Sequence, residues 1–125
     1  MTTKKIINLE DIKLLVDTFY GRVQNDEMLG HKFNDAIGDR WEEHLEKMYR
    51  FWQTILLEEH TYSGSPFPPH MKLDITKEHF DQWLAIFTKT VHDLFEGELA
   101  QEAIWRGERM AATFHYKIEY HKNSL

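Results

Sequence analysis

The segment Ser65-Pro66-Phe67-Pro68-Pro69-His70 places a histidine directly after two prolines. Proline fixes φ and has no backbone N–H, so this run has few conformations and presents the imidazole of His70 from a stiff connector. The segment stands between two stretches with apolar helical faces, where a side chain can reach into a space that both helices line. A neutral imidazole there could bind a metal ion. The alternative is that the prolines only end a helix and that His70 is a solvated loop residue.

Three further histidines have spacings that could do chemistry. His44 begins a line with Met48 and Phe51 at i, i+4 and i+7, which follows the margin of an apolar helical face. The motifs His92-x-x-x-Glu96 and His115-x-x-x-Glu119 each put an imidazole and a carboxylate one helical turn apart, as in helical di-iron proteins. Both pairs neighbour apolar stripes without belonging to them, so the non-haem di-iron site is the lesser of the metal hypotheses.

The composition excludes several function classes. The chain has 125 residues, which suits one domain spanning 1–125, and it has no cysteine for disulfides, thiolate metal sites or iron–sulfur clusters. A net charge of -6 without a basic stripe argues against a nucleic-acid partner. No apolar run approaches the roughly 20 residues of a membrane span, and the N-terminal stretch is unlike a secretory signal. We therefore expect a cytoplasmic protein with no membrane contact.

Helical periodicity predicts an all-α fold. The first helix should begin after Asn8 as its N-cap and end its apolar face with Phe19 and Tyr20 side by side. A broken segment over 25–39 follows, in which Phe33 is either a cap on the core or one wall of a pocket. The next helix should start at Asp39, with Glu42 completing a capping box, and should end before residue 59.

Two more helices are expected after the irregular connection over 58–76. Thr76 or Asp74 could cap the first of them, whose stripe is heavily aromatic and includes Trp83 and Phe87. Glu96-Gly97-Glu98 should end the pattern, and the last helix carries small residues on its inner side that let another helix approach closely. A long irregular connection inside a compact helical domain is usually functional, and His70 lies in this connection.

A single imidazole on a rigid connector, large apolar walls and a few polar groups opposite are what a five-coordinate haem requires. The order and spacing of these residues resemble the truncated haemoglobins, most closely their third group, over about residues 8–120. The resemblance is carried by Phe19-Tyr20, Phe33, His44 with Met48 and Phe51-Trp52, Pro68-Pro69-His70, and Trp83.

The resemblance implies a two-over-two helical sandwich that holds haem b, iron protoporphyrin IX. It assigns His70 as the proximal iron ligand, and Tyr20, His44 and Trp83 as the distal residues that contact bound ligand. The assigned haem-pocket positions are Phe33, Met48, Phe51 and Phe87. Lys47 and Lys72 are candidates for the haem propionates only by their proximity in the sequence.

The implied function is binding of O₂, or of another diatomic such as NO, at the haem iron. Hydrogen bonds from the distal residues would slow release of the ligand, which favours tight binding or redox chemistry on the ligand over O₂ transport. Peroxidase-like or NO-converting turnover would need an external reductase. The competing hypothesis is a cofactor-free helical interaction domain in which the aromatic residues are ordinary core.

Overall fold

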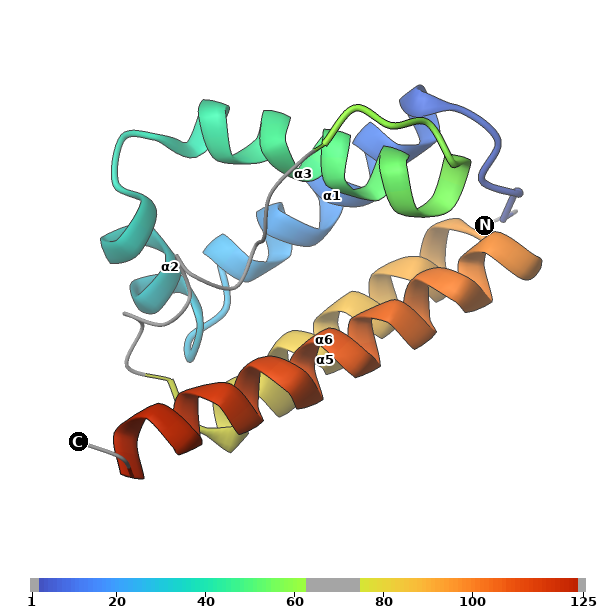
Figure 1. Cartoon of the computed structure of the whole chain (residues 1–125). Coiled ribbons are helices and arrows are strands. Elements are labelled where there is room, and N and C mark those ends of the chain that lie inside the picture. The colour runs from blue at the N-terminus through green and yellow to red at the C-terminus, as the bar shows by residue number, and fades with distance from the viewer. Residues whose placement is uncertain (1–2, 63–74, 124–125) are drawn as a thin grey trace.

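The structure is a computed structural model that describes residues 3–62 and 75–123 (Figure 1). The described residues form helices and contain no strand of a sheet. The helices are α1 (Leu9–Gln24), α2 (Gly30–Ile37), α3 (Trp41–Leu57), α5 (Lys77–Leu94) and α6 (Glu98–Asn123). Within the described part of the chain, no helix is both long enough and apolar enough to cross a membrane.

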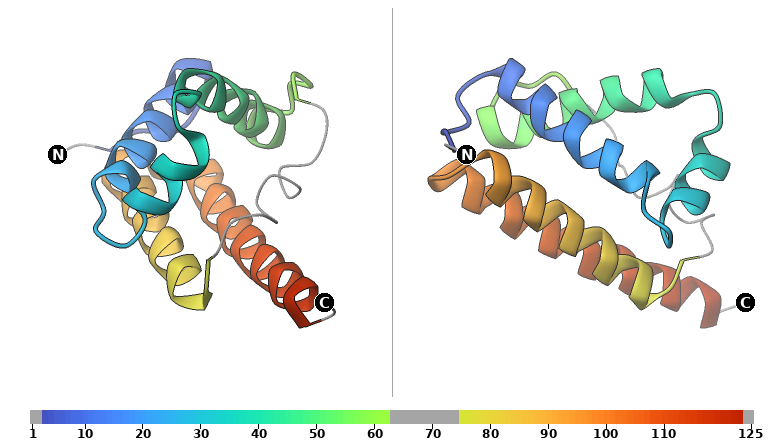
Figure 2. Two further views of the ribbon diagram at one scale, coloured as in Figure 1. Left: turned by 90° about the vertical axis from the view of Figure 1, so that its left-hand side faces the viewer. Right: turned by 180° about the vertical axis from the view of Figure 1, so that it is seen from behind.

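The helices form two layers of two. α1 packs on α3 in one layer, and α5 runs along α6 in the other; contacts of α1 with α5 and of α3 with α6 join the layers. The left view of Figure 2 shows the α5–α6 pair lying across the direction of α1, and the right view shows α2 at one end of the molecule. The predicted all-α, two-over-two sandwich is confirmed.

Local signals place α1 where the sequence predicts it. The side-chain Oδ1 of Asn8 accepts a hydrogen bond of 3.0 Å from the backbone N–H of Asp11, which satisfies one of the free donors of the first turn. Ile12, Leu15 and Val23 on the apolar face are completely buried. Tyr20 follows Phe19 at the edge of this face and is buried as well, with 7% of its surface exposed.

α5 and α6 approach each other closely because α6 presents small residues to α5. A Cβ atom added at Gly107 would lie 3.0 Å from Cδ2 of Phe87, so the glycine leaves room for that ring. The turn before α6 uses Gly97 at φ +95°, a conformation that other residues rarely adopt. Both features agree with the predicted break at 96–98 and the predicted close packing of the last helix.

The predicted capping box at Asp39 and Glu42 is wrong. α3 begins at Trp41 with Arg40 as its N-cap, and no side chain caps it. The connection from α2 is a short turn, in which the guanidinium of Arg40 donates to the carbonyl oxygens of Ala36 and Ile37 at the end of α2. The turn therefore caps the end of α2 rather than the start of α3.

An aromatic stack centred on Phe87 joins the two layers. The ring of Phe87 lies parallel to Trp83 at 5.5 Å and near-parallel to Trp52 at 5.2 Å, and meets Phe19 edge-on at 5.2 Å. These rings come from α1, α3 and α5. Burial of each large ring contributes about 2–3 kcal/mol of hydrophobic stabilisation, so the stack fixes how the layers cross.

Candidate functional site

A pocket opens between the two layers. Its cavity volume is only about 40 Å³, so the side chains around it nearly close on one another. Its walls are largely apolar and come from both layers and from α2. The lining residues are Tyr20, Leu29, Phe33, Met48, Ile75, His79, Phe80, Trp83, Met110, Ala111 and Phe114.

Tyr20 brings a buried hydroxyl to the pocket wall. Its ring meets the imidazole of His44 edge-on at 5.0 Å and packs against Phe19 and Phe33. Burial raises the pKa of the Tyr20 phenol well above its ordinary value of 10.0, because water no longer stabilises the phenolate. The phenol is therefore a neutral O–H donor throughout the physiological pH range.

His44 supports Tyr20 from α3. Its ring also meets Trp41 edge-on at 5.8 Å, and its Nε2 atom is shielded from solvent. His44 does not itself line the pocket; it contacts the tyrosine that does. The predicted neighbours Tyr20 and His44 are thus brought together across the α1–α3 contact, with the phenol on the pocket side.

Four of the residues predicted for the site line the same pocket: Tyr20, Phe33, Met48 and Trp83. They belong to α1, α2, α3 and α5, and the sequence separates the first from the last by 63 positions. Trp83 is half-buried and is held by parallel stacking on Phe87 and an edge-on contact of 5.4 Å with Phe19. The fold gathers one phenol and one indole on a shared apolar wall.

Phe51 and Phe87 do not line the pocket. Phe51 packs edge-on against Trp52 and Tyr62, and Phe87 lies in the aromatic stack between the layers. Their assignment as cofactor contacts stays a prediction. Phe87 stacks on Trp83, which lines the pocket, whereas the ring partners of Phe51 do not line it. Lys47 pairs with Glu43 at 3.2 Å on the exposed side of α3.

His70 and Lys72 lie outside the described residues. The chain is described again from Ile75, which is buried and lines the pocket.

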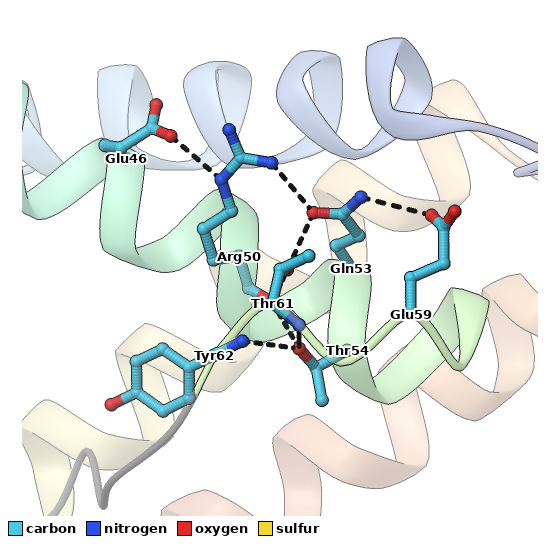
Figure 3. Close-up of polar contacts among 7 residues, drawn as sticks. All are labelled: Glu46, Arg50, Gln53, Thr54, Glu59, Thr61 and Tyr62. Atoms are coloured by element: carbon cyan, nitrogen blue, oxygen red, sulfur yellow. Dashed lines mark hydrogen bonds and ion pairs between the residues drawn. The ribbon is translucent and has the colours of Figure 1, made fainter.

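A polar network holds the chain as it leaves α3 (Figure 3). The hydroxyl oxygen of Thr54 accepts hydrogen bonds from the backbone N–H groups of Thr61 at 3.1 Å and Tyr62 at 3.0 Å. The same hydroxyl donates a hydrogen bond to the backbone carbonyl of Arg50. The hydroxyl of Thr61 donates to the buried Gln53 amide oxygen at 2.8 Å. The network therefore fixes the backbone up to Tyr62, eight positions before His70.

We expect Thr54→Val to lower the free energy of unfolding by about 1–3 kcal/mol, because two backbone N–H groups lose their acceptor while the side-chain shape is kept. Urea denaturation followed by circular dichroism measures the change. Thr113→Val, at an exposed position of α6, is the matched control. Equal stabilities of the two variants would show that the Thr54 hydroxyl contributes nothing.

Sequence reasoning missed much of the pocket wall. Ile75 directly precedes the N-cap of α5, His79 and Phe80 belong to the first turn of α5, and Met110, Ala111 and Phe114 come from α6. Their helical spacing indicates a buried face but not which part of that face borders the pocket. Of these residues, His79 could have been singled out from the sequence, because it follows the predicted N-cap Thr76 by three residues, the position of the second residue of a capping box.

The di-iron alternative finds no support in the described part of the chain. There, no three histidine, aspartate or glutamate side chains gather closely enough to hold a metal ion. His115 and Glu119 form only a loose pair, with Nε2 and Oε1 3.9 Å apart.

Two crossed pairs of helices around an apolar pocket, with a tyrosine on its wall, define a shortened globin-like protein. The sequence agrees, because it matches the family of bacterial-like globins over residues 5–116, and the chain belongs to this family. Among its relatives is the group 3 truncated hemoglobin ctb of Campylobacter jejuni subsp. jejuni serotype O:2. The two are 35% identical over 112 residues, which is 86% of this chain and 88% of the relative.

A solved structure shows the same arrangement of helices. The crystal structure of group III truncated hemoglobin from Campylobacter jejuni superposes with a TM-score of 0.84 at 32% identity, and covers 94% of this chain and 95% of its own. The predicted resemblance to the third group of truncated haemoglobins is confirmed.

Proposed function

We propose that this chain is a haem-binding globin that binds O₂, or another diatomic such as NO, at an iron ligated by His70. The observation that carries the proposal is the meeting of Tyr20, Phe33, Met48 and Trp83 on one pocket wall. Membership of a globin family supports it, since globins hold haem through a proximal histidine. The assignment of His70 as that ligand rests on the resemblance to the truncated haemoglobins and on its place after two prolines.

The side chains that line the pocket suit haem b by their chemistry, and they would have to move apart to admit it. The described walls are apolar enough to take a flat, largely apolar porphyrin, and Phe33, Met48 and Phe114 would contact it. When bound, haem supplies an iron with an open sixth position for a diatomic gas. His70 would hold the iron, and the apolar side chains would keep water away from it.

Tyr20 and Trp83 would supply the hydrogen bonds to the ligand. The phenol O–H and the indole N–H are donors, and His44 holds the phenol in place. Hydrogen bonds to a ligand that carries partial negative charge are worth about 1–3 kcal/mol each, so two of them would slow release by about 10- to 10⁴-fold. Such slow release suits tight binding or redox chemistry better than transport.

For turnover of a peroxidase-like or NO-converting kind, electrons would come from a separate reductase. All the regular secondary structure among the described residues is helical. These residues therefore contain no βαβ unit of the type that binds a nicotinamide or flavin dinucleotide. Steady-state reduction of the purified protein by NADH with and without a flavin reductase would show this dependence.

Titration of the apo-protein with haem tests the proposal. We expect one equivalent to produce a Soret band and to raise the melting temperature, since a ligand at 100 times its Kd stabilises the folded state by about 2.7 kcal/mol. A colourless, fully folded protein with an unchanged melting temperature would favour the cofactor-free interaction domain. Two irons per chain without porphyrin would favour the di-iron protein.

A further inference from the structure

The pocket wall carries an imidazole that the proposed ligand chemistry does not use. His79 is the third residue of α5, is half-buried, and lines the same pocket as Tyr20 and Trp83. The other described walls are apolar except for the phenol and the indole. A polar ring in this place needs a partner when a ligand fills the pocket, because burying it without a hydrogen bond costs free energy.

The capping box of α5 fixes which ring nitrogen of His79 is available. The backbone N–H of Thr76 donates a hydrogen bond of 3.0 Å to Nδ1 of His79. In return, the Thr76 hydroxyl oxygen accepts a hydrogen bond from the backbone N–H of His79. A ring nitrogen that accepts a hydrogen bond carries no proton, so the neutral imidazole carries its proton on Nε2. His79 therefore offers one N–H donor in addition to its capping role.

The surroundings of His79 favour a negatively charged partner. Thr76 beside it is exposed, so this end of the pocket borders solvent, in contrast to the buried end at Tyr20. The ammonium group of Lys122 lies 3.5 Å from the carbonyl oxygen of Ile75, the residue that precedes Thr76. A carboxylate is stabilised by an N–H donor and a nearby cation, and stays at the solvent margin because full burial is costly.

We propose that Nε2–H of His79 donates a hydrogen bond to a propionate carboxylate of the haem. The inference rests on the proposed function, since iron protoporphyrin IX carries two such carboxylates. His79 is then a cofactor-anchoring residue at the solvent margin, separate from the ligand-contacting residues Tyr20 and Trp83.

The variant His79→Asn tests the bond with little disturbance of the helix. The asparagine Oδ1 can take the place of Nδ1 as acceptor for Thr76, so the cap is kept while the Nε2 donor is removed. We expect ferric haem to transfer to excess apomyoglobin about 10-fold faster than from the wild type, as for one lost charge-assisted hydrogen bond. His92→Asn, at an exposed position of the same helix, should leave the rate unchanged.

Haem dimethyl ester provides the decisive comparison, because its esterified propionates carry no negative charge. We expect the wild type and His79→Asn to lose this porphyrin at rates within about twofold of each other. An equal acceleration with both porphyrins would overturn the proposal and show that His79 only supports the pocket. A changed axial-ligand spectrum in His79→Asn would overturn it in favour of a bond to iron.

The two hypotheses fail in different ways. A wild-type protein that takes up neither porphyrin would remove the proposed function and the role of His79 with it. A wild type that gives a normal Soret band, with His79→Asn losing natural haem no faster, would remove only the role of His79.

Discussion

Replacement of His70 by alanine is expected to abolish the normal Soret spectrum and to accelerate haem loss by more than about 100-fold. Changes to groups that merely orient a metal ligand already cost 10- to 100-fold, so removal of the ligand itself should cost more. Haem transfer to apomyoglobin and the absorption spectrum of the reduced protein measure the effect. Added imidazole should restore a five- or six-coordinate spectrum, because it can occupy the space left by the side chain.

His60→Ala is the matched control for this experiment. His60 is exposed and lies ten positions earlier in the chain, so its loss should leave both the spectrum and the haem-loss rate unchanged. A wild-type spectrum in His70→Ala would show that another residue ligates the iron. It would also mean that the proline-rich segment does not present the iron ligand.

Tyr20→Phe is expected to raise the O₂ dissociation rate by at least about 10-fold, because it removes the phenol O–H and leaves the ring in place. Trp83→Phe should act in the same direction through loss of the indole N–H. Stopped-flow displacement of O₂ by CO measures both rates. Tyr116→Phe is the control, since Tyr116 is 70% exposed on α6 and contributes nothing to the pocket wall.

The pH dependence of this rate adds a check on Tyr20. Burial raises the pKa of its phenol above the ordinary 10.0, so the donor proton stays in place as the pH rises toward that value. The wild-type dissociation rate should therefore show no increase from phenol ionisation below pH 10. If neither Tyr20→Phe nor Trp83→Phe changed the rate, hydrogen bonding by the two residues would play no part in holding the ligand.

The position of most helix boundaries could be derived from the sequence because short-range forces determine them. The cap at Asn8, the cap at Thr76 and the turn at Gly97 each depend on hydrogen bonds or torsion angles within a few residues. Asp39 is the instructive exception. It had the residue type for a cap, yet the short turn from α2 put Arg40 in that position.

Neither the family pattern nor burial alone separated the pocket wall from the core, since the resemblance assigned both Phe33 and Phe87 to the pocket. Phe33 and Phe87 are both buried phenylalanines on apolar helical faces, but only Phe33 borders the pocket. Phe87 instead stacks between Trp52 and Trp83. Periodicity shows that a side chain points inward, but it carries no information on what lies opposite.

The amino-acid sequence by itself determined an all-helical chain, the inward faces of its helices and a set of candidate residues around Tyr20. Only the tertiary structure decided that His44 supports the phenol, that α6 closes one side of the pocket, and that His79 joins its margin. The physical reason is the difference in range between the interactions. Caps and periodicity act within a turn or two, whereas the pocket exists only where two pairs of helices cross and the rings between them set their spacing.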